Sequence, residues 1–179
     1  MEELQEGMGS DSGRLIEIVR LCADYCSTCE NAAEMTKEEF VDRMLNLLPR
    51  IYWEFFDLQT QEILLEEGEY VTSYLDEDYY ESIRRHIEAL LGEEDVFLET
   101  FVEDMKYSDT PIGVSIAESL ADIFQPLYNF ITLVRESDGT QLTEGFIICK
   151  EDFMSYWSQT LCNVMRALNH IKYSSNNNF

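Results

Sequence analysis

Basic residues are scarce in this sequence. Its 179 residues include 12 Lys and Arg against 36 Asp and Glu, so the net charge at neutral pH is −24. A surface this negative repels phosphate backbones, so we expect no binding to nucleic acid. The same repulsion disfavours an anionic membrane surface. The acidity either keeps the protein soluble or attracts a partner protein with a basic surface.

Long apolar runs are absent as well. No stretch approaches the ~18 consecutive apolar residues of a membrane-spanning helix, and the acidic N-terminus has no apolar run of the signal-peptide kind. We therefore expect a cytoplasmic protein. The five cysteines are an odd number, and 45% hydrophobic residues are enough for a core without disulfides. Reduced thiols are expected.

Residue sets for catalysis or cofactor binding are also missing. The eight glycines are scattered and form no phosphate-binding loop. His86 and His170 are the only histidines, and neither follows a Glu by three residues, as a di-iron helical bundle requires. Cys26 and Cys29 form a C-x-x-C pair after Cys22, but no second pair completes a zinc site. Packing of these thiols on an apolar helix face is favoured over metal or redox chemistry, and no cofactor is predicted.

Apolar residues recur at helical spacing through most of the chain. The pattern predicts helices over about 14–33, 36–58, 76–91, 94–105, 113–136 and 141–173. Thr36 and Glu39 have the spacing of a capping box, and Gly92 has the position of a helix C-cap. No polar–apolar alternation is long enough to predict a sheet. We predict an all-α fold, a single-domain helical bundle of five to seven helices.

The helical domain is predicted to cover residues 14–173. A flexible acidic leader at 1–13 precedes it, a frayed polar tail at 174–179 follows it, and an ordered loop is expected at 59–78. Aromatic residues at helical spacing are usually part of a core. We expect this for Trp157 and its neighbour Tyr156, and for the group Trp53, Phe55 and Phe56.

The fifth and sixth predicted helices carry the candidate site. Glu118 and Asp122 lie one turn apart on the fifth helix, and Arg166 lies on the polar side of the sixth, with Trp157 on the same helix. If the two helices are antiparallel neighbours, these charges converge at one end of their seam. The pattern fits either a solvated face with an incidental ion pair or a ligand-binding groove.

Several motifs in a fixed order resemble a bacterial family of helical domains, numbered five-zero-six-three among the domains of unknown function. They are Leu-Leu-Pro-Arg-Ile-Tyr at 47–52, Ser-Ile-Ala-Glu-Ser-Leu-Ala-Asp-Ile-Phe at 115–124, Tyr-Trp at 156–157 and Met-Arg-Ala-Leu-Asn-His at 165–170. The resemblance covers residues 14–172 and implies a single all-helical domain in the bacterial cytoplasm, with no known activity. The positions that carry over are Pro49, Arg50, Tyr52, Glu118, Asp122, Trp157 and Arg166.

The family typically has His-Trp-Gly where this chain has Tyr156, Trp157 and Ser158. Chemistry that depends on that histidine is therefore not implied here. The sequence favours a non-enzymatic protein-interaction or regulatory module, with a basic protein or a second copy as partner. The alternative is a small-molecule-binding protein or enzyme that uses Glu118, Asp122, Trp157 and Arg166 in a groove between the fifth and sixth helices.

Overall fold

A computed structural model of the chain describes residues 2–59, 73–99 and 112–174, with the backbone alone for residues 2–12. The described residues form six α-helices: α1 (Glu2–Glu30), α2 (Lys37–Asp57), α3 (Glu77–Leu91), α4 (Ile116–Glu136), α5 (Leu142–Asp152) and α6 (Ser158–Ser174). A π-helical stretch, Phe153–Trp157, joins α5 to α6. Two short strands, β1 (Val96–Glu99) and β2 (Ile112–Ser115), form an antiparallel pair. The predicted helical single-domain fold is confirmed.

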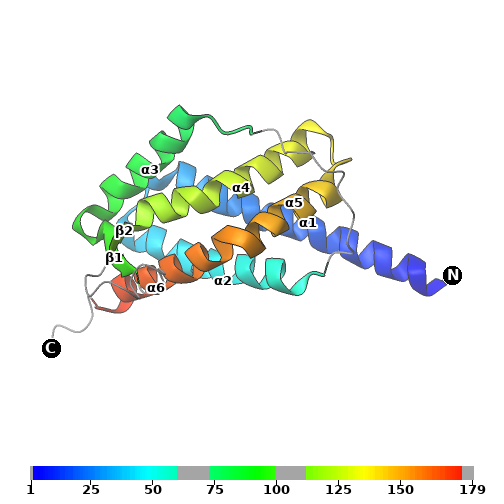
Figure 1. The fold of residues 1–179 in the computed structure, drawn as a ribbon, viewed down its shortest axis with the longest axis horizontal. Helices are drawn as coiled ribbons and strands as arrows, with labels where there is room; N and C mark the ends of the chain where they lie inside the picture. Colours follow the sequence, from blue (N-terminus) through cyan, green and yellow to red (C-terminus); the bar gives the residue numbers. More distant parts are fainter. Residues whose placement is uncertain (1, 60–72, 100–111, 175–179) are drawn as a thin grey trace.

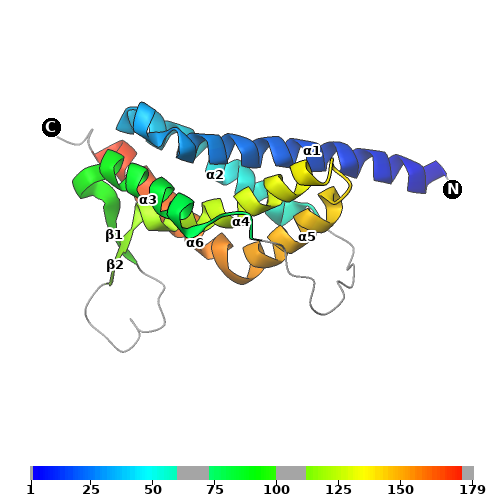
Figure 2. The same ribbon diagram turned by 90° about the horizontal axis from the view of Figure 1, so that it is seen from above.

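The helices pack around one apolar core (Figure 1). Helix α1 lies against both α2 and α4, α2 also packs on α6, and α3 and α5 cover α4. The β1–β2 pair lies at one end of the bundle, and the N-terminal end of α1 extends beyond the other helices at the opposite end (Figures 1 and 2). This arrangement leaves one long side of α1 and α2 facing solvent.

Local signals fix the helix ends as predicted. The Thr36 hydroxyl accepts from the backbone N–H of Glu39, and the Glu39 carboxylate accepts from the backbone N–H of Thr36, which is a complete capping box. Asp76 caps α3 by accepting from the backbone N–H of Tyr79 at 2.8 Å. Gly92 ends α3 with φ of 60°, a conformation that side chains with a Cβ rarely adopt.

The predicted helix over 94–105 is wrong in its described part, because Val96–Glu99 is a strand whose register runs from Val96 opposite Ser115 to Glu99 opposite Ile112. The pairing also moves the start of α4 from residue 113 to Ile116. Exposure alternates along β1, but four residues are too few to show a period of two in the sequence.

The other predicted boundaries concern the two ends of the chain and the loop at 59–78. The backbone of residues 2–13 continues α1, so the predicted helix start at about Arg14 is wrong. Whether this leader is flexible stays a prediction. Most of the loop expected at 59–78 and most of the tail at 174–179 lie outside the described residues. In the described part of the chain, no helix has both the length and the apolarity needed to cross a bilayer.

Rings from α2 and the π-helical stretch pack together in the core. Trp157 is fully buried, with its ring centroid 4.9 Å from that of Phe55 and 4.7 Å from that of Phe153, both in edge-on contacts. The core positions expected for Phe55 and Trp157 are therefore confirmed. Those expected for Trp53, Phe56 and Tyr156 are wrong, because these side chains are exposed.

Candidate functional site

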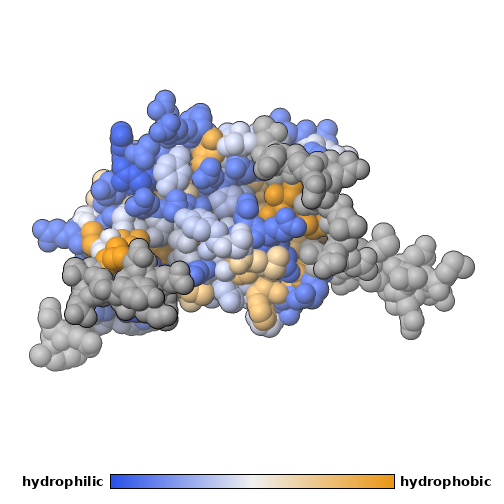
Figure 3. All heavy atoms as spheres, viewed as in Figure 1, coloured by the Kyte–Doolittle hydropathy of each residue, from blue (hydrophilic) through white to orange (hydrophobic). Residues whose placement is uncertain are grey.

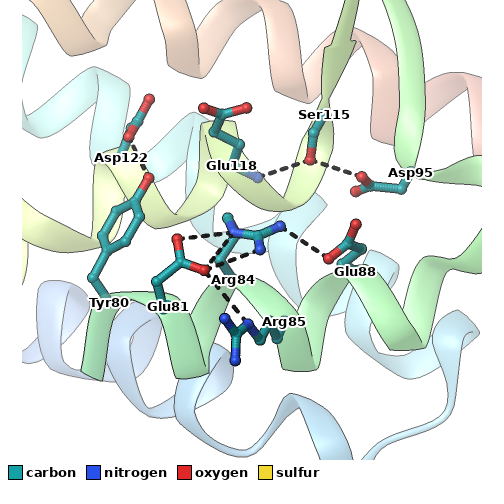
Figure 4. A network of polar contacts seen from close by, with 9 residues as sticks. All are labelled: Tyr80, Glu81, Arg84, Arg85, Glu88, Asp95, Ser115, Glu118 and Asp122. Carbon is teal, nitrogen blue, oxygen red and sulfur yellow. Dashed lines mark hydrogen bonds and ion pairs between the residues drawn. The ribbon is translucent and has the colours of Figure 1, made fainter. Parts of the chain in front are cut away.

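Asp122 links three elements of the bundle. From the middle of α4, its carboxylate accepts a hydrogen bond from the Tyr80 hydroxyl of α3 at 2.7 Å and from the Tyr156 hydroxyl of the π-helical stretch at 3.0 Å. Figure 4 shows the Tyr80 contact at the edge of a wider polar network on α3 and α4. Both oxygens of the carboxylate are thus engaged by the protein itself.

The two phenols are held in their protonated state. Burial raises the pKa of the Tyr80 hydroxyl, and the hydrogen bond to Asp122 raises it further. Burial and the charge of Asp122 also raise the pKa of Tyr156. A phenol whose pKa is raised remains a hydrogen-bond donor at neutral pH and is a poor base. The arrangement therefore holds α3, α4 and the π-helical stretch together.

Glu118 lies one turn before Asp122 and is exposed. Its backbone N–H donates to the hydroxyl of Ser115, the N-cap of α4, at 3.0 Å. That hydroxyl donates in turn to the buried carboxylate of Asp95 at 2.7 Å, and the other oxygen of Asp95 accepts from the backbone N–H of Ala117 at 2.8 Å (Figure 4). Two residues thus cap α4, and the Glu118 carboxylate has no hydrogen bond or ion pair within the described residues.

Arg166 lies on the exposed side of α6. Helices α4 and α6 are antiparallel, because Asp122 meets Tyr156 just before α6 while Ile116, at the start of α4, lines the same groove as Ala167. Arg166 lines this groove, of about 640 Å³, beside β1. No ion pair joins it to Glu118 or Asp122, although all three residues are described. The carboxylates and the arginine are therefore not brought together as one charge cluster.

Trp157 is also separate from these charges. Its indole N–H donates to the backbone carbonyl of Cys149 at 3.3 Å, inside the core. A ring that is fully buried and already hydrogen-bonded has no free surface for a ligand.

The face seen in Figure 1 is mostly hydrophilic over its coloured atoms, with hydrophobic residues in smaller separate areas (Figure 3).

The thiols have the environment expected of core residues. Cys22, Cys26, Cys29 and Cys149 are buried and free, and burial raises the pKa of each. Raised pKa values keep these thiols protonated and unreactive at neutral pH. In residues 13–59, 73–99 and 112–174, no group of three or more His, Cys, Asp or Glu side chains is placed to hold a metal ion.

A second surface was not identified from the sequence as a site. Two adjoining grooves of about 500 Å³ and 270 Å³ run along the solvent side of α1 and α2. Arg43, Asn46, Arg50 and Trp53 line them from α2, and all four side chains are exposed. Their spacing of three, four and three residues places them on one face of the helix. That spacing is the sequence signal by which this set can be recognised.

Comparison with known proteins identifies a family and a structural relative. The family model described as Domain of unknown function (DUF5063) matches residues 10–174. A crystal structure of protein BF1032 from Bacteroides fragilis has a TM-score of 0.74 and 31% sequence identity, over 90% of this chain and 93% of that chain. A search of the curated proteins gave no match. Neither description names an activity, so function is argued from the surface.

Proposed function

The chain belongs to the DUF5063 family, as its motifs predicted, and we propose that it is a non-enzymatic protein-interaction module that binds through the solvent side of α1 and α2. One observation supports this most directly. Trp53 and Phe56, neighbours on α2 with ring centroids 6.4 Å apart, have exposed fractions of 56% and 58%. Exposed aromatic side chains that adjoin one another mark binding surfaces more often than isolated ones do.

A half-buried tyrosine on the same helix packs against Phe56. Tyr52 stacks on Phe56 at 6.2 Å with an interplanar angle of 11°, and it also contacts the buried ring of Phe153 edge-on at 5.4 Å. Tyr52, Trp53 and Phe56 therefore form an aromatic platform anchored to the core. A platform held in place before binding loses little side-chain entropy when a partner covers it. Trp and Tyr are also the residues most often found at the energetic centre of protein interfaces.

The alternative, a ligand site or active site at Glu118, Asp122, Trp157 and Arg166, is less well supported. The Asp122 carboxylate already accepts two phenol protons, and the Trp157 indole is buried in the core. Arg166 and Asp122 form no ion pair with each other. A catalytic pair would need a group with a pKa near neutrality within reach of a substrate. These contacts favour a structural role for Asp122 and Trp157.

Two kinds of partner are compatible with the surface. A net charge of −24 favours a protein with a basic surface, because opposite charges accelerate encounter and like charges oppose it. A second copy of the chain is the other candidate. It requires a face on which the acidic charge is locally offset.

Photo-crosslinking tests the proposed surface. Trp53 is replaced by a photoreactive phenylalanine analogue in the cells from which the chain derives, and the same analogue is placed at Tyr173 of α6, whose exposed fraction is 59%. We expect a discrete protein adduct from position 53 that is absent from position 173. If position 53 gives no adduct, or if both positions give the same adducts, the proposal is refuted.

A further inference from the structure

The face of α2 that lines the two grooves is symmetric about its own centre. Arg43, Asn46, Arg50 and Trp53, here called the α2 stripe, are spaced three, four and three residues apart, with the midpoint at residue 48. This is the spacing by which one helix presents a straight seam to another. When two such stripes face each other antiparallel, position 43 meets position 53 and position 46 meets position 50.

Three of the four carboxylates that line the same grooves already have partners. Glu17 pairs with Arg20, Asp42 with Lys172, and Glu54 with Arg14. The remaining lining carboxylate, Asp24, has no ion pair within the described residues.

The two arginines of the stripe lack acidic partners. Arg43 forms no hydrogen bond or ion pair within the described residues, and Arg50 donates only to the Asn46 side chain at 3.4 Å. In a chain with three times as many acidic as basic residues, this face has two guanidinium groups that remain available to an external group.

We propose that the α2 stripe is a homodimer interface, in which it docks antiparallel on the same stripe of a second copy about a two-fold axis. This inference rests on the proposed function and names its partner. The symmetry places Arg43 of each copy over Trp53 of the other, where a guanidinium binds the face of an indole. It also brings Arg50 of each copy to the level of Asn46 and Asp24 of the other.

Electrostatics favours this face over the rest of the surface. Two copies that each carry −24 repel one another, and on most faces their contact brings acidic side chains together. The α2 stripe contains two cations and no acid, and three of the carboxylates beside it are already neutralised by ion pairs. The aromatic platform extends the stripe beyond Trp53 and adds the apolar area that a stable dimer needs.

Sedimentation velocity of the full chain over a range of concentrations tests the proposal. We expect a monomer–dimer equilibrium that Trp53→Arg abolishes, because it places two arginines against each other at both symmetric contacts. Trp53→Ala should weaken the dimer by at least about 100-fold, or roughly tenfold for each of the two contacts. Arg43→Glu provides an independent disruption of the same pair.

The decisive variant exchanges the two residues. Arg43→Trp combined with Trp53→Arg restores a guanidinium–indole contact in the proposed dimer, so the dimer should return to within about tenfold of its original strength. Tyr173→Arg makes the same charge change at an exposed position of α6 that lines neither groove, and should leave the dimer intact. Circular dichroism confirms that each variant is folded.

Three results would overturn the inference: a chain that is monomeric at every concentration, a dimer that survives Trp53→Arg, or an exchange variant that does not recover. The proposed function and the dimer can be refuted independently of each other. A monomeric chain that still crosslinks at position 53 to another protein keeps the interaction surface and excludes the second copy as its occupant.

Discussion

Asp95→Ala is expected to weaken the fold more than the removal of any exposed carboxylate beside α4, because Asp95 is buried. The Asp95 side chain is 5% exposed and accepts two hydrogen bonds, from the Ser115 hydroxyl at 2.7 Å and from the backbone N–H of Ala117 at 2.8 Å. Hydrogen bonds to charged groups contribute about 1.5–3 kcal/mol each, and a buried donor left without an acceptor costs about 1–3 kcal/mol. The carboxylate also lies at the N-terminus of α4, where a negative charge adds roughly 0.3–1 kcal/mol.

These contributions overlap, because the Ser115 hydroxyl is only partly buried and can turn to water. We therefore expect a loss of about 2–4 kcal/mol in the free energy of unfolding, measured by urea denaturation with the m-value unchanged. Asp95→Asn keeps one acceptor oxygen for the backbone N–H of Ala117, and its amide N–H can donate to the Ser115 hydroxyl, so it should cost less than Asp95→Ala, about 1 kcal/mol. Glu93→Ala, at a neighbouring exposed position, is the control and should stay within about 0.5 kcal/mol. If Asp95→Ala costs no more than the control, the cap does not stabilise α4 as argued.

Gly145→Ala and Gly13→Ala should have opposite signs in the same assay. A Cβ at Gly145 would lie 3.1 Å from Phe130 and Leu133 of α4, so overpacking should outweigh the gain in helix propensity and destabilise the chain by about 1 kcal/mol. No atom lies within 4 Å of a Cβ at Gly13, so Ala there should stabilise by about 0.5–1 kcal/mol; equal effects would contradict the packing argument. Tyr80→Phe should reduce the loss of stability above about pH 10, because the raised pKa of Tyr80 means that the unfolded chain releases this proton first. That loss approaches roughly 1.4 kcal/mol per pH unit for one proton, and a variant with an unchanged alkaline slope would refute the assignment.

The features that the sequence predicts correctly are those that depend on residues within one helical turn of each other. The capping box of Thr36 and Glu39 joins residues three apart, and the C-cap at Gly92 depends on the conformation of one residue. The same reasoning missed β1, because its partner strand begins 13 residues after Glu99, and a pair of four-residue strands has no periodic signal of its own.

The exposed position of Trp53 was predictable, although the core was predicted instead. The apolar stripe of α2 runs through Ile51 and Phe55, and a residue midway between them in the sequence points to the opposite side of the helix. Strict helical spacing therefore places Trp53 with Arg50 and Asn46. The aromatic character of Trp53 suggested a core position, whereas helical periodicity predicts the exposed position that the structure has.

The ion pairs expected within the candidate charge cluster are not formed among the described residues, and the reason is non-local. The antiparallel packing of α4 and α6 follows from their order in the chain, but the rotation of each helix about its axis depends on what packs around it. Two tyrosines, from α3 and the π-helical stretch, donate hydrogen bonds to the Asp122 carboxylate. Arg166 lines the groove beside β1 instead. No pattern within either helix encodes these partners, because they come from other elements.

The excess of acidic residues makes the two arginines of the α2 stripe unusual, because neither has an acidic partner within the described residues. With 36 acidic residues and 12 basic ones, a cation on this surface has acidic neighbours available almost everywhere. An arginine without an acidic partner therefore lies where the fold places few free carboxylates, and two such arginines occur two turns apart beside an exposed indole. Solubility explains neither the two arginines nor the exposed indole. Acidic side chains increase solubility more than basic ones do, and an exposed tryptophan lowers it. The combination is explained by a surface that another molecule covers, and its symmetric spacing points to a copy of the same chain.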